Sequence, residues 1–142
     1  ELAAAAQARG LAGAFRFLPY QARTLLSYSL GAADVHWVSL DPRLEGLMVP
    51  SKFYGIAAAG KPIIVIGDPN GELAQLVRRN ACGFAVAPGD SDALAATLRQ
   101  LSETPQTVSE MGARARKMLD AHFTRRQGLA RWRQLLDHLD AG

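Results

Sequence analysis

The apolar positions of this 142-residue chain fall into short runs, separated by stretches in which they recur at helical spacing. Four runs of four to six residues carry β-branched or aromatic side chains, and the strongest is an unbroken Ile-Ile-Val-Ile block. Runs of this length that are bounded by Gly, Pro or Asp are typical of strands. We therefore predict strands at Ala14–Leu18, Val35–Leu40, Ile63–Ile66 and Gly83–Val86.

Between these runs, apolar residues recur three or four positions apart, which is the spacing of one face of a helix. The clearest stripe lies near the C-terminal end and holds Leu129, Trp132, Leu135, Leu136 and Leu139. The stripe indicates packing, either in the core or against a partner domain. The predicted helices are Leu2–Arg9, Arg23–Ala32, Ser51–Ala59, Glu72–Asn80, Asp92–Leu101, Thr104–His122 and Gln127–Leu139.

Several residues mark where these helices begin and end. Ser51 is expected to be the N-cap of its helix, and Gly60 is expected to end the same helix in a left-handed conformation. Asp90 or Ser91 is expected to cap the helix that follows the last strand.

Strands that alternate with helices predict a parallel sheet with right-handed crossovers. Ile63–Ile66 is apolar at every position, which suits a central strand covered on both faces. The chain is long enough for one domain with a real core. The predicted fold class is therefore α/β, with a parallel Rossmann-like sheet flanked by helices. We expect a single domain over residues 1–142, with C-terminal helices from about residue 104.

Composition narrows the class of protein. Hydrophobic residues make up 49% and charged residues 20%, as in an ordinary globular domain. No apolar run approaches the roughly 20 residues that cross a bilayer. The single cysteine, Cys82, excludes an internal disulfide and a Cys-based zinc site, and its apolar neighbours predict a buried thiol.

Positive charge is concentrated late in the chain. The net charge is +3, and residues 114–133 hold seven Lys and Arg side chains against the single acid Asp120. A basic helical end can contact anionic lipid head groups or nucleic acid, but a solvated helix face has the same composition. We expect no nucleic-acid partner, and a peripheral membrane contact is the alternative to the solvated face.

Ligands of an open parallel sheet bind beyond the carboxyl ends of its strands. Three loops meet that description, at Asp41–Pro50, Gly67–Gly71 and Ala87–Asp90. The first loop runs straight into a helix, where backbone N–H groups and the helix dipole favour phosphate. Ser51 and Lys52 add a hydroxyl and a cation at the same place. This loop is therefore a candidate phosphate site, or else a plain connection with Lys52 in solvent.

The other polar residues have two interpretations each. Glu72 follows Gly71 at a predicted helix start, where it either faces a ligand or only complements the helix dipole. His36 lies within an apolar strand, where a structural position is favoured over a catalytic one. No cluster of His, Cys, Asp and Glu has metal-ligand spacing, so we predict no metal site.

Several segments in order resemble one enzyme family. They are FLPYQ at Phe17–Gln21, AADVHWVSL at Ala32–Leu40, VPSKFYGIAAAGKPIIVIGDPNGELAQLV at Val49–Val77 and CGFAVAPGDSDALAATL at Cys82–Leu98. Together they resemble the C-terminal, donor-binding domain of retaining GT-B glycosyltransferases, whose fold has two Rossmann domains. The resemblance is greatest to bacterial enzymes that build cell-surface polysaccharides, and it covers nearly the whole chain.

The resemblance implies where a nucleotide-diphosphate sugar binds. The substrate-binding residues that it points to are Glu45, Gly46, Val49, Pro50, Ser51, Lys52, Tyr54, Gly71 and Glu72. Many members of the family carry two glutamates eight positions apart, and the second of them holds the ribose. The corresponding positions here are Leu47 and Gly55, so neither glutamate is in register. Glu45 stands two positions early, and Tyr54 or Lys52 is a candidate substitute for the ribose contact.

The expected function is therefore donor binding for transfer of a sugar to a saccharide or lipid-linked acceptor. The resemblance implies no cofactor, with the nucleotide-diphosphate sugar as donor substrate. It implies a cytoplasmic location, and contact with the inner membrane surface is an open alternative. The catalytic residues cannot be identified from this sequence. It also implies an absent N-terminal acceptor domain and absent first strands, so the exposed sheet edge is expected to self-associate. A non-catalytic nucleotide-binding module and a GT-B sugar-nucleotide epimerase are the alternatives.

Overall fold

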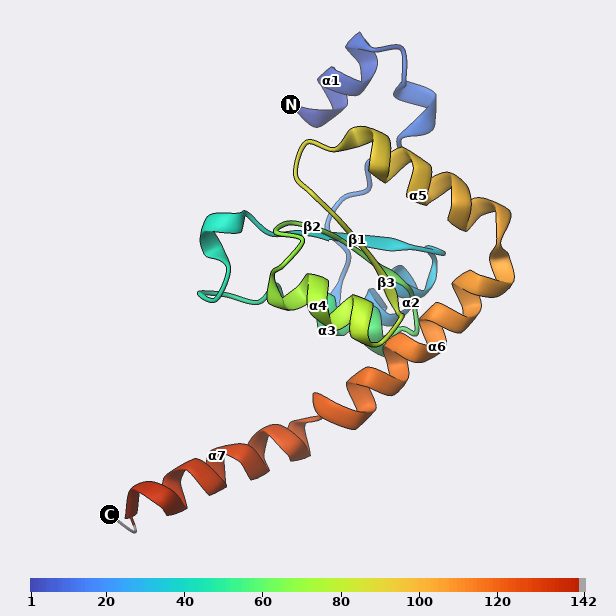
Figure 1. Ribbon diagram of the computed structural model, residues 1–142. Helices are drawn as coiled ribbons and strands as arrows, with labels where there is room; N and C mark the ends of the chain where they lie inside the picture. The colour runs from blue at the N-terminus through green and yellow to red at the C-terminus, as the bar shows by residue number, and fades with distance from the viewer. Residues whose placement is uncertain (141–142) are drawn as a thin grey trace.

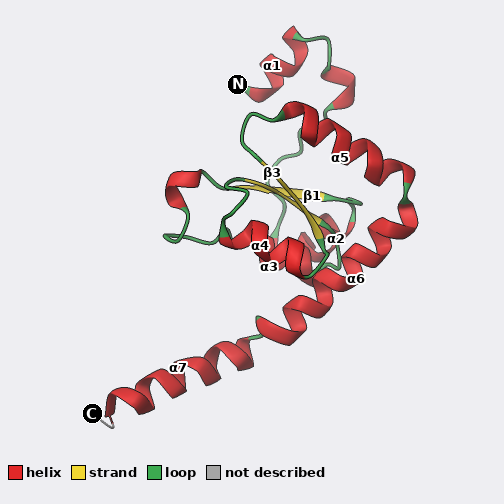
Figure 2. Cartoon of the chain, viewed as in Figure 1, coloured by secondary structure: helices red, strands yellow, loops and turns green. Residues whose placement is uncertain are grey.

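A computed structural model gives the three-dimensional arrangement of the chain and describes residues 1–140 (Figure 1). Helices are the predominant element, and three short strands form a sheet in their midst (Figure 2). In chain order the elements are α1 Leu2–Ala8, η1 Ala12–Ala14, η2 Arg23–Leu25, α2 Leu26–Gly31, β1 His36–Ser39, η3 Pro42–Leu44, α3 Lys52–Ala58, β2 Ile63–Ile66, α4 Glu72–Arg79, β3 Gly83–Val86, α5 Ser91–Glu103, α6 Pro105–His122 and α7 Arg125–Asp140.

The sheet is parallel, with the strand order β1-β2-β3. Trp37 pairs with Ile64, which in turn pairs with Phe84, so the three strands run in step. The predicted α/β class and the central place of Ile63–Ile66 are confirmed. Because the strands are parallel, their carboxyl ends and the loops that follow lie at one edge of the sheet.

Alternating residues of β2 face two separate cores. Ile63 and Val65 join the cluster formed by α3, α4 and the middle of α6, in which Phe53 and Val77 are fully buried. Ile64 faces the other cluster, with α5 and the first turns of α6. Figure 1 shows α3 and α4 on one side of the sheet and α5 on the other. A central strand buried on both faces has no place for polar side chains, which explains its composition.

β1 is covered less completely than the other two strands. Its residue Val38 is buried on the α3 side, but Trp37, which points to the α5 side, is 50% exposed. The register partner of Trp37, Ile64, is fully buried. One edge of β1 also pairs with no other strand within residues 1–140. The α5 face of the sheet is therefore closed over β2 and β3 and open over β1.

The predicted strand at Ala14–Leu18 is wrong. The segment begins with the end of η1 and continues as extended chain outside the sheet. Its aromatic side chains Phe15 and Phe17 stack on each other, with ring centroids 6.0 Å apart, and both stay about half exposed. An alternating pattern gives a strand only where a neighbouring strand offers hydrogen bonds, and none of the three strands pairs with this segment.

Two of the three predicted caps are confirmed. Gly60 has a φ of +66°, and the N–H groups of Gly60 and Lys61 donate to the carbonyls of Ala57 and Ile56, as in a Schellman motif. Asp90, rather than Ser91, accepts the N–H of Ala93 at 2.9 Å and caps α5.

Ser51 stands at the N-cap position of α3, as predicted, but its side chain forms no capping hydrogen bond. Its backbone is already helical, with φ −59° and ψ −25°. A capping hydroxyl needs the extended backbone of an N-cap residue to reach back to the helix N–H groups. The N–H of Phe53 donates to the carbonyl of Pro50 instead, at 3.0 Å.

The last helix, α7, extends away from the rest of the chain (Figure 1). Its five large apolar side chains are 52–69% exposed, and together they form the stripe predicted from the sequence: Leu129, Trp132, Leu135, Leu136 and Leu139. Among the described residues these side chains belong to neither core cluster. The stripe is therefore a surface feature of this domain.

Candidate functional site

The loops after β1, β2 and β3 lie together at the carboxyl edge of the sheet. The loop after β1 contains η3, and the two glycine-containing loops after β2 and β3 lead into α4 and α5. The predicted substrate residues belong to the first two loops, to the start of α3 and to the start of α4. The fold therefore gathers at one edge residues that are up to 27 positions apart.

The start of α3 offers unused hydrogen-bond donors. Within residues 1–140, the N–H groups of Val49, Ser51 and Lys52 donate to no acceptor. The side chains of Ser51 and Lys52 are exposed, and Lys52 forms no salt bridge in the described part of the chain. Donors at a helix start, with a cation beside them, are suited to an anionic group. Binding of a phosphate group at Val49–Lys52 stays a prediction.

Glu45 connects the loop after β1 to α4. Its Oε1 accepts the backbone N–H of Glu72 at 2.5 Å, across 27 positions of sequence. A Cβ added to Gly71 would lie 2.6 Å from the Glu45 Cδ, so the carboxylate occupies the space that any other residue at 71 would fill. The Glu45 carboxylate therefore occupies the amino terminus of α4. Sequence reasoning selected Glu45, Gly71 and Glu72 separately and missed that they contact one another.

Tyr54 points to the core side of α3. Its ring packs edge-on against Phe53, with centroids 5.5 Å apart, and against Phe123 of the loop after α6 at 5.2 Å. Burial raises the pKa of Tyr54 above its usual value, and the nearby Glu72 carboxylate raises it further. The phenol therefore keeps its proton at neutral pH and can both donate and accept a hydrogen bond.

The two positions at which many relatives carry glutamate differ in surroundings. Leu47 is 78% exposed on the loop after β1. Gly55 lies against α2, where an added Cβ would be 3.3 Å from Cδ1 of Leu30. A longer side chain at residue 55 therefore has to displace Leu30 or turn away from it.

The remaining polar candidates have structural roles: Asp68 lies at the carboxyl edge, whereas His36 and Cys82 lie at the amino ends of β1 and β3. Nε2 of His36 donates to the carbonyl of Leu30 at 2.8 Å, which supports the structural interpretation of this histidine. Oδ1 of Asp68 accepts the N–H of Asn70 at 2.8 Å, as in an Asx turn. Cys82 is fully buried, and burial raises the pKa of its thiol to about 11.

Two arginines of the basic segment donate hydrogen bonds to distant parts of the chain. Nε of Arg114 donates to the carbonyl of Ala81 at 2.6 Å, and Nη1 of Arg116 donates to the carbonyl of Ala58 at 3.1 Å. Arg116 also pairs with Asp120 at 2.8 Å. They connect α6 to the carbonyl ends of α3 and α4. Partners 33 and 58 positions apart leave no local pattern in the sequence, so sequence reasoning missed this role.

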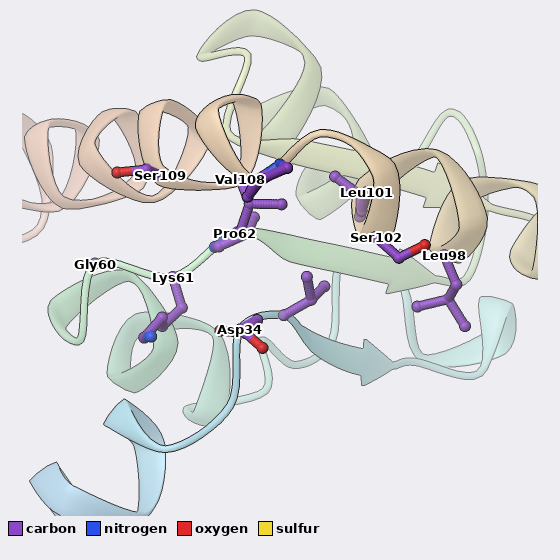
Figure 3. A pocket seen from close by; sticks show the side chains of 11 residues that line it. Asp34, Gly60, Lys61, Pro62, Leu98, Leu101, Ser102, Val108 and Ser109 are labelled. Carbon is purple, nitrogen blue, oxygen red and sulfur yellow. The ribbon is translucent and has the colours of Figure 1, made fainter.

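A cavity lies at the opposite end of the sheet (Figure 3). It has a volume of about 620 Å³ and lies before the amino ends of β1 and β2, beside Asp34 and Pro62, with the junction of α5 and α6 on its other side. None of the predicted substrate residues lines it. Its place is therefore distinct from the carboxyl edge.

Residues 1–118 match the family of glycosyl transferases group 1. The chain belongs to this family. It is 31% identical over 98 residues to the probable glycosyltransferase WbjE of Pseudomonas aeruginosa, a stretch that covers 69% of this chain and 24% of that protein. The family match agrees with the resemblance of the sequence segments to donor-binding domains.

A solved structure has the same fold. Sucrose-phosphate synthase from Thermosynechococcus elongatus superposes with a TM-score of 0.82 at 23% identity, over 99% of this chain and 34% of the synthase. The chain thus spans about a quarter of the curated relative and a third of this structure. This chain and the synthase therefore share the α/β fold.

No helix among residues 1–140 is both long enough and apolar enough to cross a membrane. The arginines of α7 and its apolar stripe are exposed on the described surface. Contact of this helix with lipid head groups stays a prediction.

Proposed function

We propose that this domain binds the nucleotide-diphosphate sugar donor of a retaining glycosyltransferase. Membership of the glycosyl transferases group 1 family supports the donor class. We place the donor diphosphate at the start of α3 because the N–H groups of Val49, Ser51 and Lys52 have no acceptor within residues 1–140. They lie at the carboxyl edge of a parallel sheet, where such folds bind their ligands.

The chemical task of these groups is to stabilise the leaving nucleoside diphosphate. Negative charge develops on its phosphates as the sugar departs, and oriented donors lower the barrier when they are already in place. The N–H groups at the start of α3 supply fixed dipoles, and Lys52 supplies a mobile positive charge. The loop containing Gly46 and Pro50 completes the proposed contact surface.

The acceptor and the rest of the reaction belong to the larger protein in this proposal. An N-terminal domain would bind a saccharide or lipid-linked acceptor, and the pathway would be cell-surface polysaccharide synthesis in the cytoplasm. The similarity to WbjE, over 69% of this chain, supports a bacterial glycosyltransferase of this general kind.

The test is calorimetric titration of UDP and GDP into the protein and into its Lys52→Ala variant. We expect the substitution to weaken diphosphate binding by about 1–2 kcal/mol, the range of a charge-assisted hydrogen bond at a partly open site. The difference should shrink as salt is added, because an exposed charge is screened. Thermal stability should change little, since the Lys52 side chain is exposed.

Lys61→Ala is the matched control. Lys61 lines the cavity at the opposite end of the sheet, so its removal changes the net charge equally but leaves the proposed site intact. Equal losses of affinity in the two variants would indicate a non-specific charge effect. Equal affinity in the wild type and the Lys52→Ala variant would remove Lys52 from the site.

A further inference from the structure

The contact between Glu45 and α4 has two independent features. The first is the hydrogen bond of 2.5 Å from the N–H of Glu72 to the Glu45 carboxylate. The second is the absence of a side chain at Gly71, where the three atoms nearest to an added Cβ all belong to that carboxylate. The backbone of Gly71, with φ −64° and ψ 165°, is open to any residue. Glycine is therefore needed here for space and not for conformation.

The loop held by this contact is the one that leads into α3. Glu45 is the second residue of a tight turn in which the N–H groups of Leu47 and Met48 both donate to the carbonyl of Leu44, at 3.0 and 3.3 Å. Gly46 follows with a φ of +75°. The chain then continues directly to the free N–H groups at the start of α3. A displacement of Glu45 therefore moves the segment that carries those donors.

We propose that Glu45 is a positioning residue, which fixes the loop after β1 against α4 so that the donors of Val49–Lys52 are held in place for the diphosphate. In this role the carboxylate binds the protein and does not bind the donor. The proposal rests on the proposed function, because it assigns the diphosphate to the start of α3. It also explains why Gly71 and Glu72 belong to the site without touching the ligand.

A double-mutant cycle tests the contact itself. Glu45→Ala removes the carboxylate, and Gly71→Ala adds a methyl group that displaces it. Each single variant should speed hydrogen exchange at the amides of Leu47, Met48 and Glu72. Adding Gly71→Ala to the Glu45→Ala protein should have little further effect, because the carboxylate that the methyl meets is gone. Additive effects on exchange would overturn the proposal.

The functional part is tested by UDP affinity in the same proteins, with Glu45→Gln as the conservative variant. Glutamine keeps an oxygen that accepts the Glu72 N–H, whereas alanine does not. We expect Glu45→Ala and Gly71→Ala to weaken UDP binding about tenfold, in line with coupling energies within one hydrogen-bond network. Glu45→Gln should bind within about twofold of the wild type if position matters rather than charge.

The outcomes separate this proposal from the proposed function. If the wild type binds neither UDP nor GDP, the donor proposal fails, and the exchange cycle alone decides whether Glu45 holds the loop. If Glu45→Gln loses as much affinity as Glu45→Ala while loop exchange stays slow, the carboxylate contacts the ligand directly and the positioning role is overturned. Unchanged affinity in Glu45→Ala overturns it as well.

Discussion

At Gly112, helix α6 packs closely on the turn between α3 and β2, and Gly112→Ala tests that packing. A Cβ on Gly112 would lie 2.1 Å from the carbonyl oxygen of Gly60 and 2.9 Å from its carbonyl carbon. Real Cβ atoms essentially never come within 3.0 Å of such an atom. Relief of the oxygen contact alone needs a shift of 3.0 − 2.1 = 0.9 Å. Backbone faces backbone here, so no side chain can rotate to give way.

Two effects of the substitution oppose each other. Alanine is favoured over glycine inside a helix by about 1 kcal/mol. Forcing extra volume into a packed contact costs about 1–3 kcal/mol, and the upper part of that range applies where neither partner can adjust. We therefore expect the steric cost to exceed the gain, with a net loss of about 1–2 kcal/mol in the free energy of unfolding.

The assay is urea denaturation followed by far-UV circular dichroism, with thermal unfolding as a second measurement. A loss of this size corresponds to a fall of roughly 2–8 °C in Tm for a chain of this length. Gly128→Ala is the matched control, because Gly128 also lies within a helix but has no atom within 4 Å of an added Cβ. This control should be neutral or slightly stabilising. If Gly112→Ala is as stable as Gly128→Ala, the close approach of α6 to the turn is refuted.

Three further predictions concern Cys82 and the open strand edge. Because burial raises the pKa of the Cys82 thiol to about 11, a thiol-specific reagent at pH 8 should label it only after denaturation, and rapid labelling of the folded protein would contradict its burial. The pKa of the Cys82 thiol in the folded protein lies above the ordinary value of 9.0. The buried neutral thiol therefore contributes fully to stability below about pH 9, and this contribution is lost as pH rises through 11. A series of Tm measurements across this pH range would detect the loss. The unpaired edge of β1, beside the half-exposed Trp37, should make the chain self-associate, which light scattering would detect. Trp37→Lys should reduce the self-association. A monomer at high concentration would count against this expectation.

Local patterns in the sequence were enough for most elements of this fold. An uninterrupted run such as Ile63–Ile66 can be satisfied only by burial on both faces, which already places it at the centre of a parallel sheet. Gly60 and Asp90 act within one helical turn of their own positions, so their roles follow from residue type and spacing. The carboxyl edge as the place of the candidate site follows in the same way from strand–loop–helix order.

Only the tertiary structure decided the features that depend on distant partners. Ala14–Leu18 has a strand pattern but no strand beside it, and pairing is a property of two segments rather than one. The contact of Glu45 with Glu72, and the empty space at Gly71 that admits it, join residues 26 and 27 positions apart. Arg116 reaches Ala58 across 58 positions. Hydrogen bonds of this kind depend on which segments the packed helices bring together in space. A pattern along the sequence does not predict the distance between two segments far apart in the chain.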